Sequence, residues 1–345
     1  MESKILKTNI RTTLILISFL VIFALFSDDD YSKPTNFRRQ TSTAEMNTYD
    51  DQAGDVDEMK RGTQSMTKVP VMHTFLELDP KGFNKGHERM IESWKASWES
   101  RGWETRVLTL DDAKAHPEFE TFTAKLERLE LNAYEKKCYW RWMAMSALHG
   151  DEYNEEDSYF MSDYDTIPLE LDAQRGLALI EESNGIFTAY DNHVPCLMQG
   201  TRSEWDRVLH LLFDSLPKSW TKVSDMLSFL KVRETLGDDA GIIWKSDVQS
   251  DFPFQNDENG EVVISCEKSK KIAVHLSHRA CSDAYRNHIY PSKVMDHGIL
   301  GSRGSVATYI VQEYLERCEK EDVGSLEAEE KRIEDIPLVE LSLKQ

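Results

Sequence analysis

The sequence predicts an α/β fold in which helices cover a largely parallel β-sheet. Apolar runs of strand length alternate along the chain with segments of helical periodicity, and turn residues separate them. Such alternation is typical of the strand–helix–strand units that build a parallel sheet. One apolar run, at residues 158–162, ends in two aspartates one residue apart. Ligands of open α/β sheets bind beyond the carboxyl ends of the strands, so this strand end is the first candidate for a functional site.

The elements follow in order from residue 69. Strands are expected at 69–78, 103–110, 158–163, 184–191, 196–200, 240–244, 261–265 and 271–278, where short apolar runs stand between turn residues. Helices are expected at 87–102, 134–150, 203–216 and 306–321, and a turn with a helix start at 111–119. In the first helix Met90, Trp94 and Trp98 have helical spacing, which favours core packing of the tryptophans over stacking on a sugar.

The amino-acid composition of the chain limits the classes of molecule that it can bind. The 345 residues carry a formal net charge of −20. Binding to nucleic acid requires a basic surface, so no nucleic acid is expected as a partner. The five cysteines form no C-x-x-C pair, which predicts neither a structural zinc site nor a dense disulfide framework. One or two disulfides are compatible with this number, and at least one thiol is left over.

The N-terminal segment predicts a membrane address. Residues 1–11 contain Lys4, Lys7 and Arg11, and residues 12–27 are uncharged and mostly apolar. We expect a cytoplasmic tail followed by a transmembrane signal anchor, because a positively charged flank stays on the cytoplasmic side. A cleaved signal peptide is the alternative, since the apolar segment is short for a membrane span. The polar residues 28–68 predict a disordered stem, and residues 319–345 an acidic C-terminal tail.

Asp163 and Asp165 give the strongest chemical signal. Residues two apart in an extended chain point to the same side, so the two carboxylates can converge. Nearby carboxylates repel each other unless a cation neutralises them. Mg²⁺ and Mn²⁺ prefer oxygen ligands and leave positions for substrate phosphates, so a divalent cation is the favoured partner. The alternative is a solvated turn before Pro168.

Several segments together resemble glycosyltransferases of the GT-A fold that carry a DXD sugar-binding region, the family of the yeast-type initiating α-1,6-mannosyltransferase and of α-1,4-galactosyltransferases. The segment "VPVMHTFLEL" is similar to the first strand of that family, and "SWKASWESRGWETRVLTLDDA" to the stretch that follows it. The segment "KKCYWRWMAMSALHG … YFMSDYDTIPL" is similar to the helix and strand leading into the DXD motif, and "VPCLMQGTRSEWDRVLHLL" to a later strand and helix. The motif residues matched are His73, Arg141, Trp142, Gly150, Asp163 and Asp165.

The resemblance implies a single GT-A, Rossmann-like catalytic domain at 69–318, behind the anchor and stem. In that family's pattern Asp165 binds the metal, and Asp163 binds the metal and the sugar or ribose of the donor. His73 and Arg141 are expected to contact the donor; a surface arginine beside an apolar stripe is the alternative for Arg141.

A third metal ligand late in the chain is also implied by the resemblance. His275 is the first choice because it ends the apolar run within the strand expected at 271–278, with His278 as second choice and a purely structural histidine as the alternative. Two departures from the family pattern stand out. Cys138 occupies a position where the family has aspartate, and "GDEYNEEDSYF" is longer than the corresponding family segment.

Asp238 and Asp239 stand directly before the apolar run at 240–244 and are candidate catalytic residues. A carboxylate at such a position can deprotonate or orient the hydroxyl of an acceptor, and Asp239 ranks before Asp238. The alternative is the N-cap and first turn of a helix, where carboxylates complement the helix dipole.

The expected function is transfer of a hexose from GDP-mannose or a UDP-hexose to a hydroxyl group of a glycan or glycolipid, with Mn²⁺ or Mg²⁺ as cofactor. The expected location is the Golgi membrane, as a single-pass type II protein with a lumenal catalytic domain. One alternative is a non-catalytic partner subunit that binds a nucleotide sugar or glycan, which Cys138 favours. Another is a phosphatase of the haloacid-dehalogenase type, because "DYDTI" nearly matches the D-x-D-x-[TV] motif of those enzymes.

Overall fold

The computed structural model describes residues 69–78, 85–150, 153–216, 223–267, 269–294 and 298–319. These residues belong to one compact unit, Ser65–Gln345. The expected cytoplasmic tail at 1–11, anchor at 12–27 and stem at 28–68 lie outside the described residues, and so does the acidic tail beyond residue 319. Among the helices within the described ranges, none is both long and apolar enough to cross a membrane.

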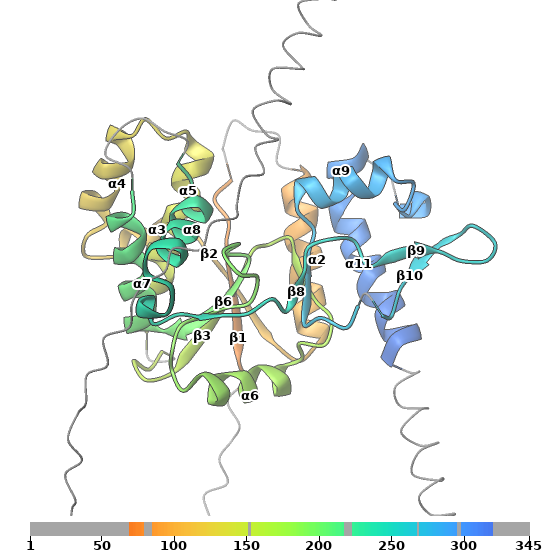
Figure 1. Cartoon of the computed structure of the whole chain (residues 1–345), viewed down its shortest axis with the longest axis horizontal. Helices are drawn as coiled ribbons and strands as arrows, with labels where there is room; N and C mark the ends of the chain where they lie inside the picture. The colour runs from red at the N-terminus through yellow and green to blue at the C-terminus, as the bar shows by residue number, and fades with distance from the viewer. Residues whose placement is uncertain are drawn as a thin grey trace, which may run out of the picture. The chain divides into compact units, whose positions relative to one another are not determined.

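A six-stranded sheet forms the centre of the domain (Figure 1). β1 pairs in parallel with β2 and β3, and β5 pairs in parallel with β7, whereas β6 runs antiparallel to its neighbours β3 and β5. The expected mixed α/β fold with a mostly parallel sheet is therefore confirmed, and it is compatible with a Rossmann-like fold. The strands, in spatial order, are β2 (Glu104–Leu108), β1 (Val71–Phe75), β3 (Ser158–Ser162), β6 (Leu197–Thr201), β5 (Thr188–Ala189) and β7 (Ile243–Trp244).

Helices cover both faces of this sheet. Figure 1 shows α3, α4, α5, α7 and α8 gathered on one side of the sheet, with α2 and α11 on the other. The helices are α2 (Lys85–Ser100), α3 (Leu110–Lys114), α4 (Phe119–Arg128), α5 (Ala133–Ser146), α6 (Ala173–Ser183), α7 (Arg202–Asp214), α8 (Asp225–Leu236), α9 (His278–Arg286), α10 (Gly298–Gly301) and α11 (Arg303–Glu313). Short 3₁₀ segments are η1 (Gly237–Ala240) and η2 (Ser292–Val294), and η3 (Tyr314–Cys318) is a π-helical turn.

The central strand β3 is buried on both faces, because its side chains alternate between two apolar cores. Tyr159 and Met161 belong to the core built with α4, α5, α7 and α8. Phe160 belongs to the core that contains Trp94 and Trp98 of α2. The two tryptophans are completely buried, which confirms their expected packing role. β3 therefore runs between two apolar cores, and the two aspartates, which are partly buried, follow directly at its end.

A second, three-stranded sheet begins directly after the two aspartates. It contains β4 (Thr166–Pro168), β11 (Ala273–His275) and β8 (Val248–Gln249), with β11 in the middle. β11 runs antiparallel to β4, and His275 is the register partner of Thr166. A separate hairpin is formed by β9 (Phe254–Asn256) and β10 (Val262–Ile264). The register places His275 beside the turn that joins the two larger sheets.

Candidate functional site

The two aspartates lie in a short turn between β3 and β4, where the chain leaves one sheet and joins the other. The backbone N–H of Asp163 donates to the carbonyl of Cys196 (2.8 Å), and the N–H of Thr166 donates back to the carbonyl of Asp163 (2.9 Å). The carbonyl of Asp165 accepts from the N–H of Leu276 (2.7 Å). Hydrogen bonds to both sheets therefore fix the backbone of the turn, which is not the solvated turn considered as an alternative.

The side chains of Asp163, Asp165 and His275 converge as the sequence predicted. His275 Nε2 lies 3.4 Å from Asp165 Oδ1 and 3.9 Å from Asp163 Oδ2. The side chains of Asp165 and His275 are each only 13% exposed. One ligand atom from each of the three residues falls within 4.8 Å of the others, a grouping that can hold a metal ion.

One oxygen of each carboxylate accepts a hydrogen bond from an arginine, and the other oxygen faces His275. Arg141 of α5 donates from Nη1 to Asp163 Oδ1. Arg303, the first residue of α11, donates from Nη1 to Asp165 Oδ2 at 2.5 Å. The oxygens that remain, Asp163 Oδ2 and Asp165 Oδ1, are those nearest to His275 Nε2. This arrangement orients two oxygen donors and one nitrogen donor toward one point, as outer partners of metal ligands do.

The two aspartates of this site differ in pKa. Burial raises the pKa of Asp163 to about 6, although the attraction of Arg141 opposes the rise. Burial also opposes ionisation of Asp165, but His275 and Arg303 outweigh it and lower the pKa of Asp165 to about 2. Burial disfavours the charged form of His275 as well, yet Cys196 and Asp165 outweigh this and raise its pKa well above the usual value. Without a metal, His275 is therefore the cation that faces Asp165.

Arg141 is a site residue, as expected, and its guanidinium is shared between two carboxylates. Besides Asp163 it contacts Asp225, the first residue of α8, through Nε (3.0 Å) and Nη2. Asp225 Oδ2 also accepts from the indole of Trp142 (3.1 Å). Cys138 lies one turn before Trp142 on the same helix, and burial together with the charge of Asp225 raises the pKa of its thiol to about 12. The surface-arginine alternative for Arg141 is wrong, since the residue is buried.

Sequence reasoning missed Asp225 and Arg303. Both lie at the start of helices and far along the chain from Asp163, so no short motif connects them with it. The available signal was weak: Ser224 before Asp225 is a good N-cap residue, and its side chain accepts from the N–H of Leu227. Arg303 opens a helix that was expected to begin only at residue 306.

His73 does not join the acidic pair. It lies completely buried in β1, where its Nδ1 is 2.9 Å from the carbonyl of Phe160 and its Nε2 is 3.0 Å from the hydroxyl of Tyr153. Burial lowers the pKa of His73 to about 4, so the ring is neutral. Both ring nitrogens already have partners within the protein, and a role in holding the strand fits this geometry better than the expected contact to a donor.

Asp238 and Asp239 also stand apart from the site. Both are exposed residues of η1, where the carbonyl of Asp238 accepts from the N–H of Gly241. They follow the far end of α8, whose first residue is Asp225. A helix rises about 1.5 Å per residue, so the length of α8 separates them from Asp225 by about 18 Å. Of the two expectations, the first turn of a short helix is therefore the one that fits, and the structure does not bring these residues to the acidic pair.

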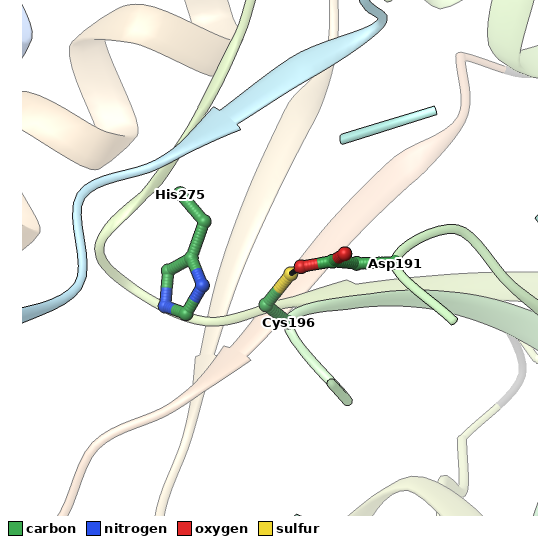
Figure 2. A group of neighbouring side chains, drawn as sticks. All are labelled: Asp191, Cys196 and His275. Atoms are coloured by element: carbon green, nitrogen blue, oxygen red, sulfur yellow. Dashed lines mark hydrogen bonds between the residues drawn. The ribbon is translucent and has the colours of Figure 1, made fainter. Parts of the chain in front are cut away.

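His275 also borders a second group of potential ligands. Cys196 directly precedes β6, and its thiol donates to Asp191 Oδ2 at 3.5 Å. Figure 2 shows Cys196 between His275 and Asp191, with a ring nitrogen of His275 on the side of the sulfur. Ligand atoms of these three residues also lie within 4.8 Å of one another. His275 is therefore common to two groups of potential metal ligands.

Two cavities of the described part lie away from the acidic pair. One, of about 520 Å³, is lined by the beginnings of β1, β2 and β3 and by Leu177 and Ile180 of α6. The other, of about 650 Å³, lies along β10 and η3. Neither has Asp163 or Asp165 in its lining.

Comparison with known proteins adds no assignment. No protein-family model matches the chain, and no curated protein matches it significantly. The geometry and chemistry of the site therefore carry the functional argument.

Proposed function

We propose that this protein is a metal-dependent glycosyltransferase that moves a hexose from GDP-mannose or a UDP-hexose to a hydroxyl group of a glycan or glycolipid. The observation that carries the proposal is the convergence of Asp163 Oδ2, Asp165 Oδ1 and His275 Nε2 at the carboxyl end of the central strand. Ligands of α/β sheets bind at such strand ends. The finer assignment to the GT-A fold belongs to this proposal, and the mostly parallel sheet is compatible with it.

The donor set suits Mn²⁺ or Mg²⁺. Two carboxylate oxygens are hard ligands, and a single imidazole is acceptable to Mn²⁺. Three protein ligands leave positions for the oxygens of a diphosphate, whose negative charge a bound cation offsets as the sugar is transferred. Arg141 and Arg303 would hold the two carboxylates in the orientation that this requires.

The surroundings of Asp165 favour an anionic ligand. Burial and the charge of Arg303 lower the pKa of both His87 and His278, so these two side chains are neutral and lie near the Arg303 guanidinium. Tyr164, the residue between the two aspartates in the chain, contacts both His87 and Arg303: its hydroxyl is 2.9 Å from His87 Nδ1, and the Arg303 guanidinium is 6.0 Å from its ring centre. Hydrogen-bond donors and positive charge of this kind suit the phosphate oxygens of a nucleotide sugar.

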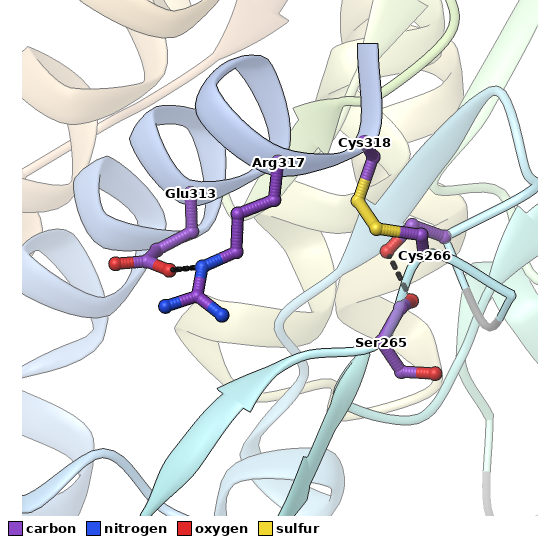
Figure 3. Close-up of a disulfide and its surroundings, with 6 residues drawn as sticks. Ser265, Cys266, Glu313, Arg317 and Cys318 are labelled. Carbon is purple, nitrogen blue, oxygen red and sulfur yellow. Dashed lines mark hydrogen bonds and ion pairs between the residues drawn. A yellow bond between two sulfur atoms is a disulfide. The ribbon is translucent and has the colours of Figure 1, made fainter. Parts of the chain in front are cut away.

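A Golgi lumenal location also belongs to the proposal, and a disulfide supports it. Cys266, shortly after β10, is bonded to Cys318, the last residue of η3 (Figure 3). Disulfides persist in the secretory route and are rare in the cytosol. The bond closes a loop of sequence separation 52, and a loop of that length corresponds to about 4 kcal/mol of stabilisation. Cys138, Cys196 and Cys281 are free.

The location can be tested by counting thiols. In protein isolated from the secretory route and denatured without reductant, we expect three reactive thiols per chain, and five after reduction. Cys318→Ser should lower the free energy of unfolding by up to about 4 kcal/mol. Five reactive thiols before reduction would contradict the proposed location.

The second candidate function is that of a non-catalytic subunit that binds a nucleotide sugar or glycan. The observation that favours it is the pairing of the two carboxylates within the protein itself, by Arg141, Arg303 and His275. An active transferase and a binding subunit differ in turnover, so one set of assays separates them.

The assay uses the full-length chain with Mn²⁺ and a panel of GDP-mannose, UDP-galactose, UDP-glucose and UDP-N-acetylglucosamine. The proposal predicts release of nucleoside diphosphate from at least one donor, dependent on Mn²⁺ and lost on chelation. Binding of a donor without release would support the non-catalytic alternative. Release of phosphate from an aryl phosphate would support the phosphatase alternative and contradict the proposal.

A further inference from the structure

We propose that Asp191, Cys196 and His275 form a binding site for Zn²⁺, and that Zn²⁺ there excludes the hard cation proposed at Asp163 and Asp165. The exclusion rests on the proposed function, because it requires a cation at the acidic pair. The zinc site itself does not, since its other two ligands belong to a different part of the chain. Asp191 follows β5 and Cys196 precedes β6, so two neighbouring strands of the central sheet supply them.

The distances fit a small tetrahedral ion. Asp191 Oδ2 and Cys196 Sγ are 3.5 Å apart, and the ligand atoms of all three residues lie within 4.8 Å of one another. Zn–S and Zn–O bonds of about 2.3 and 2.0 Å at a tetrahedral angle place the sulfur and oxygen about 3.5 Å apart. The two atoms are therefore already at the separation that a shared Zn²⁺ ion requires. Only His275 has to approach, by a small movement of its ring.

The ligand types select the metal. One sulfur, one nitrogen and one oxygen suit Zn²⁺ or a similar borderline ion, whereas Mg²⁺ and Mn²⁺ favour oxygen-rich sites such as the acidic pair. Cys196 is completely buried, as the ligands of protein zinc sites often are. Burial raises the pKa of its thiol to about 12, so the thiol keeps its proton until a metal displaces it. Binding then forms the Zn–S bond, breaks the S–H bond and releases that proton to solvent.

His275 makes the two sites exclusive. Its Nε2 is the ring nitrogen that faces Asp165, and the ring nitrogen on the side of Cys196 in Figure 2 is directed toward the second group. A neutral imidazole has one lone pair, because its other nitrogen carries a proton. A tautomer that gives its lone pair to a cation at the acidic pair therefore points an N–H at Cys196, and the opposite tautomer points an N–H at Asp165. One histidine thus serves one metal at a time.

The test uses the purified full-length chain and Co²⁺ as a spectroscopic substitute for Zn²⁺. A thiolate bound to Co²⁺ gives a charge-transfer band that a chain without a thiolate ligand lacks. We expect this band in the unmodified protein, its loss in Cys196→Ser, and its retention in Cys281→Ser. Cys281 is the matched control, because it is another free and completely buried cysteine, whose thiol donates to the carbonyl of Leu276 instead.

Zn²⁺ should displace the Co²⁺ band with one ion per chain, and Cys196→Ser should weaken Zn²⁺ binding at least about tenfold. Asp191→Asn, which keeps the thiol, should retain a weaker band and so separates loss of a ligand from loss of the fold. Absence of the band in the unmodified protein, or its persistence in Cys196→Ser, would overturn the zinc site.

Exclusion is read from bound Mn²⁺ by electron paramagnetic resonance. Zn²⁺ should release Mn²⁺ from the unmodified chain at concentrations at least about tenfold lower than those needed in Cys196→Ser, where Zn²⁺ competes only directly at the acidic pair. Simultaneous binding of Mn²⁺ and Zn²⁺ would overturn the exclusion. If Mn²⁺ does not bind at all while the cobalt band appears, the zinc site stands and the proposed function fails.

Discussion

His73 and His275 both lie in β-strands with little exposure, yet His73 is neutral and His275 is positively charged. His73 lies within β1, and its pKa is lowered to about 4. His275 lies at the end of β11, and its pKa is raised well above the usual value. Burial alone lowers the pKa of any histidine, because it disfavours the charged form. The difference therefore comes from the partners: a carbonyl and a hydroxyl for His73, a carboxylate for His275.

The partners of His73 suit a structural role, whereas those of His275 suit a role in binding or catalysis. Along the middle of a strand, backbone groups are paired and a side chain meets neutral neighbours. At the junction of the two sheets, α5, α8 and α11 bring charged side chains to one point through Arg141, Asp225 and Arg303. A histidine placed there is coupled to carboxylates and arginines, which is the situation in which perturbed pKa values mark candidate functional sites.

The largest effect is expected when the charge network around Asp163 is broken at Asp225. Asp225→Ala removes one of the two carboxylates that neutralise the buried Arg141. Breaking a buried ion pair by removing one partner typically lowers the free energy of unfolding by about 3–5 kcal/mol. Urea denaturation measures this loss. The double variant Arg141→Met, Asp225→Leu serves as the control and should recover part of the stability, because it removes the unpaired guanidinium, although Asp163 loses its Arg141 partner.

A loss below about 1 kcal/mol in Asp225→Ala would contradict the network, because it would place the Arg141–Asp225 pair among exposed pairs, which contribute that little. The charge network near His275 would then stabilise the fold no more than an exposed ion pair does.

A smaller effect is expected from pH acting on His73. The unfolded chain protonates this residue near 6.5, and the folded protein only near 4. Between these values the unfolded state binds the extra proton, so stability is fully present above about pH 6.5 and falls as pH drops toward 4. The lost amount is on the order of 3 kcal/mol. Urea denaturation at several pH values should give a steeper decline for the unmodified protein than for His73→Gln.

The NMR titration of the His73 ring provides a direct check of the same point. A midpoint near the ordinary value of 6.5 would show that His73 is not held neutral, and the contrast with His275 would disappear.

The smallest effect is expected at η1. Asp238→Asn and Asp239→Asn change exposed residues, and exposed substitutions usually alter stability by less than about 0.5 kcal/mol. Neither should alter Mn²⁺ binding or donor turnover if the site lies where the acidic pair is. A loss of turnover with unchanged stability would restore the sequence-based expectation that these aspartates act on the acceptor.

The sequence predicted the sheet and the acidic pair because both depend on local patterns. The apolar run of β3 and the spacing of Asp163 and Asp165 are contiguous in the chain. The family resemblance implied a third ligand late in the chain, and His275 was chosen because it ends an apolar run. Arg141 came from the family resemblance. These residues do meet, so the positions of the three ligands proposed at the acidic pair were predictable, whereas Asp191 and Cys196 were not.

The rest depended on tertiary contacts that leave no local pattern. α8 was not predicted because its apolar residues are spread around the helix instead of forming a stripe, and Asp225 was missed with it. His73 was assigned to the donor from the resemblance, whereas its partners Phe160 and Tyr153 come from segments more than 70 residues away. The proximity of His275 to Cys196 also depends on how three strands are arranged in space, and no local sequence pattern reveals it.

The most direct test of the account compares Mn²⁺ affinity in the unmodified chain, His275→Ala and His73→Ala. Removing a histidine is preferable to removing an aspartate here, because loss of Asp165 would leave Arg303 buried and unpaired. His73→Ala removes another poorly exposed ring, which lies outside the site. We expect His275→Ala to weaken Mn²⁺ binding at least about tenfold and His73→Ala to leave it unchanged. Equal affinities in all three proteins would contradict the metal centre on which the proposed function depends.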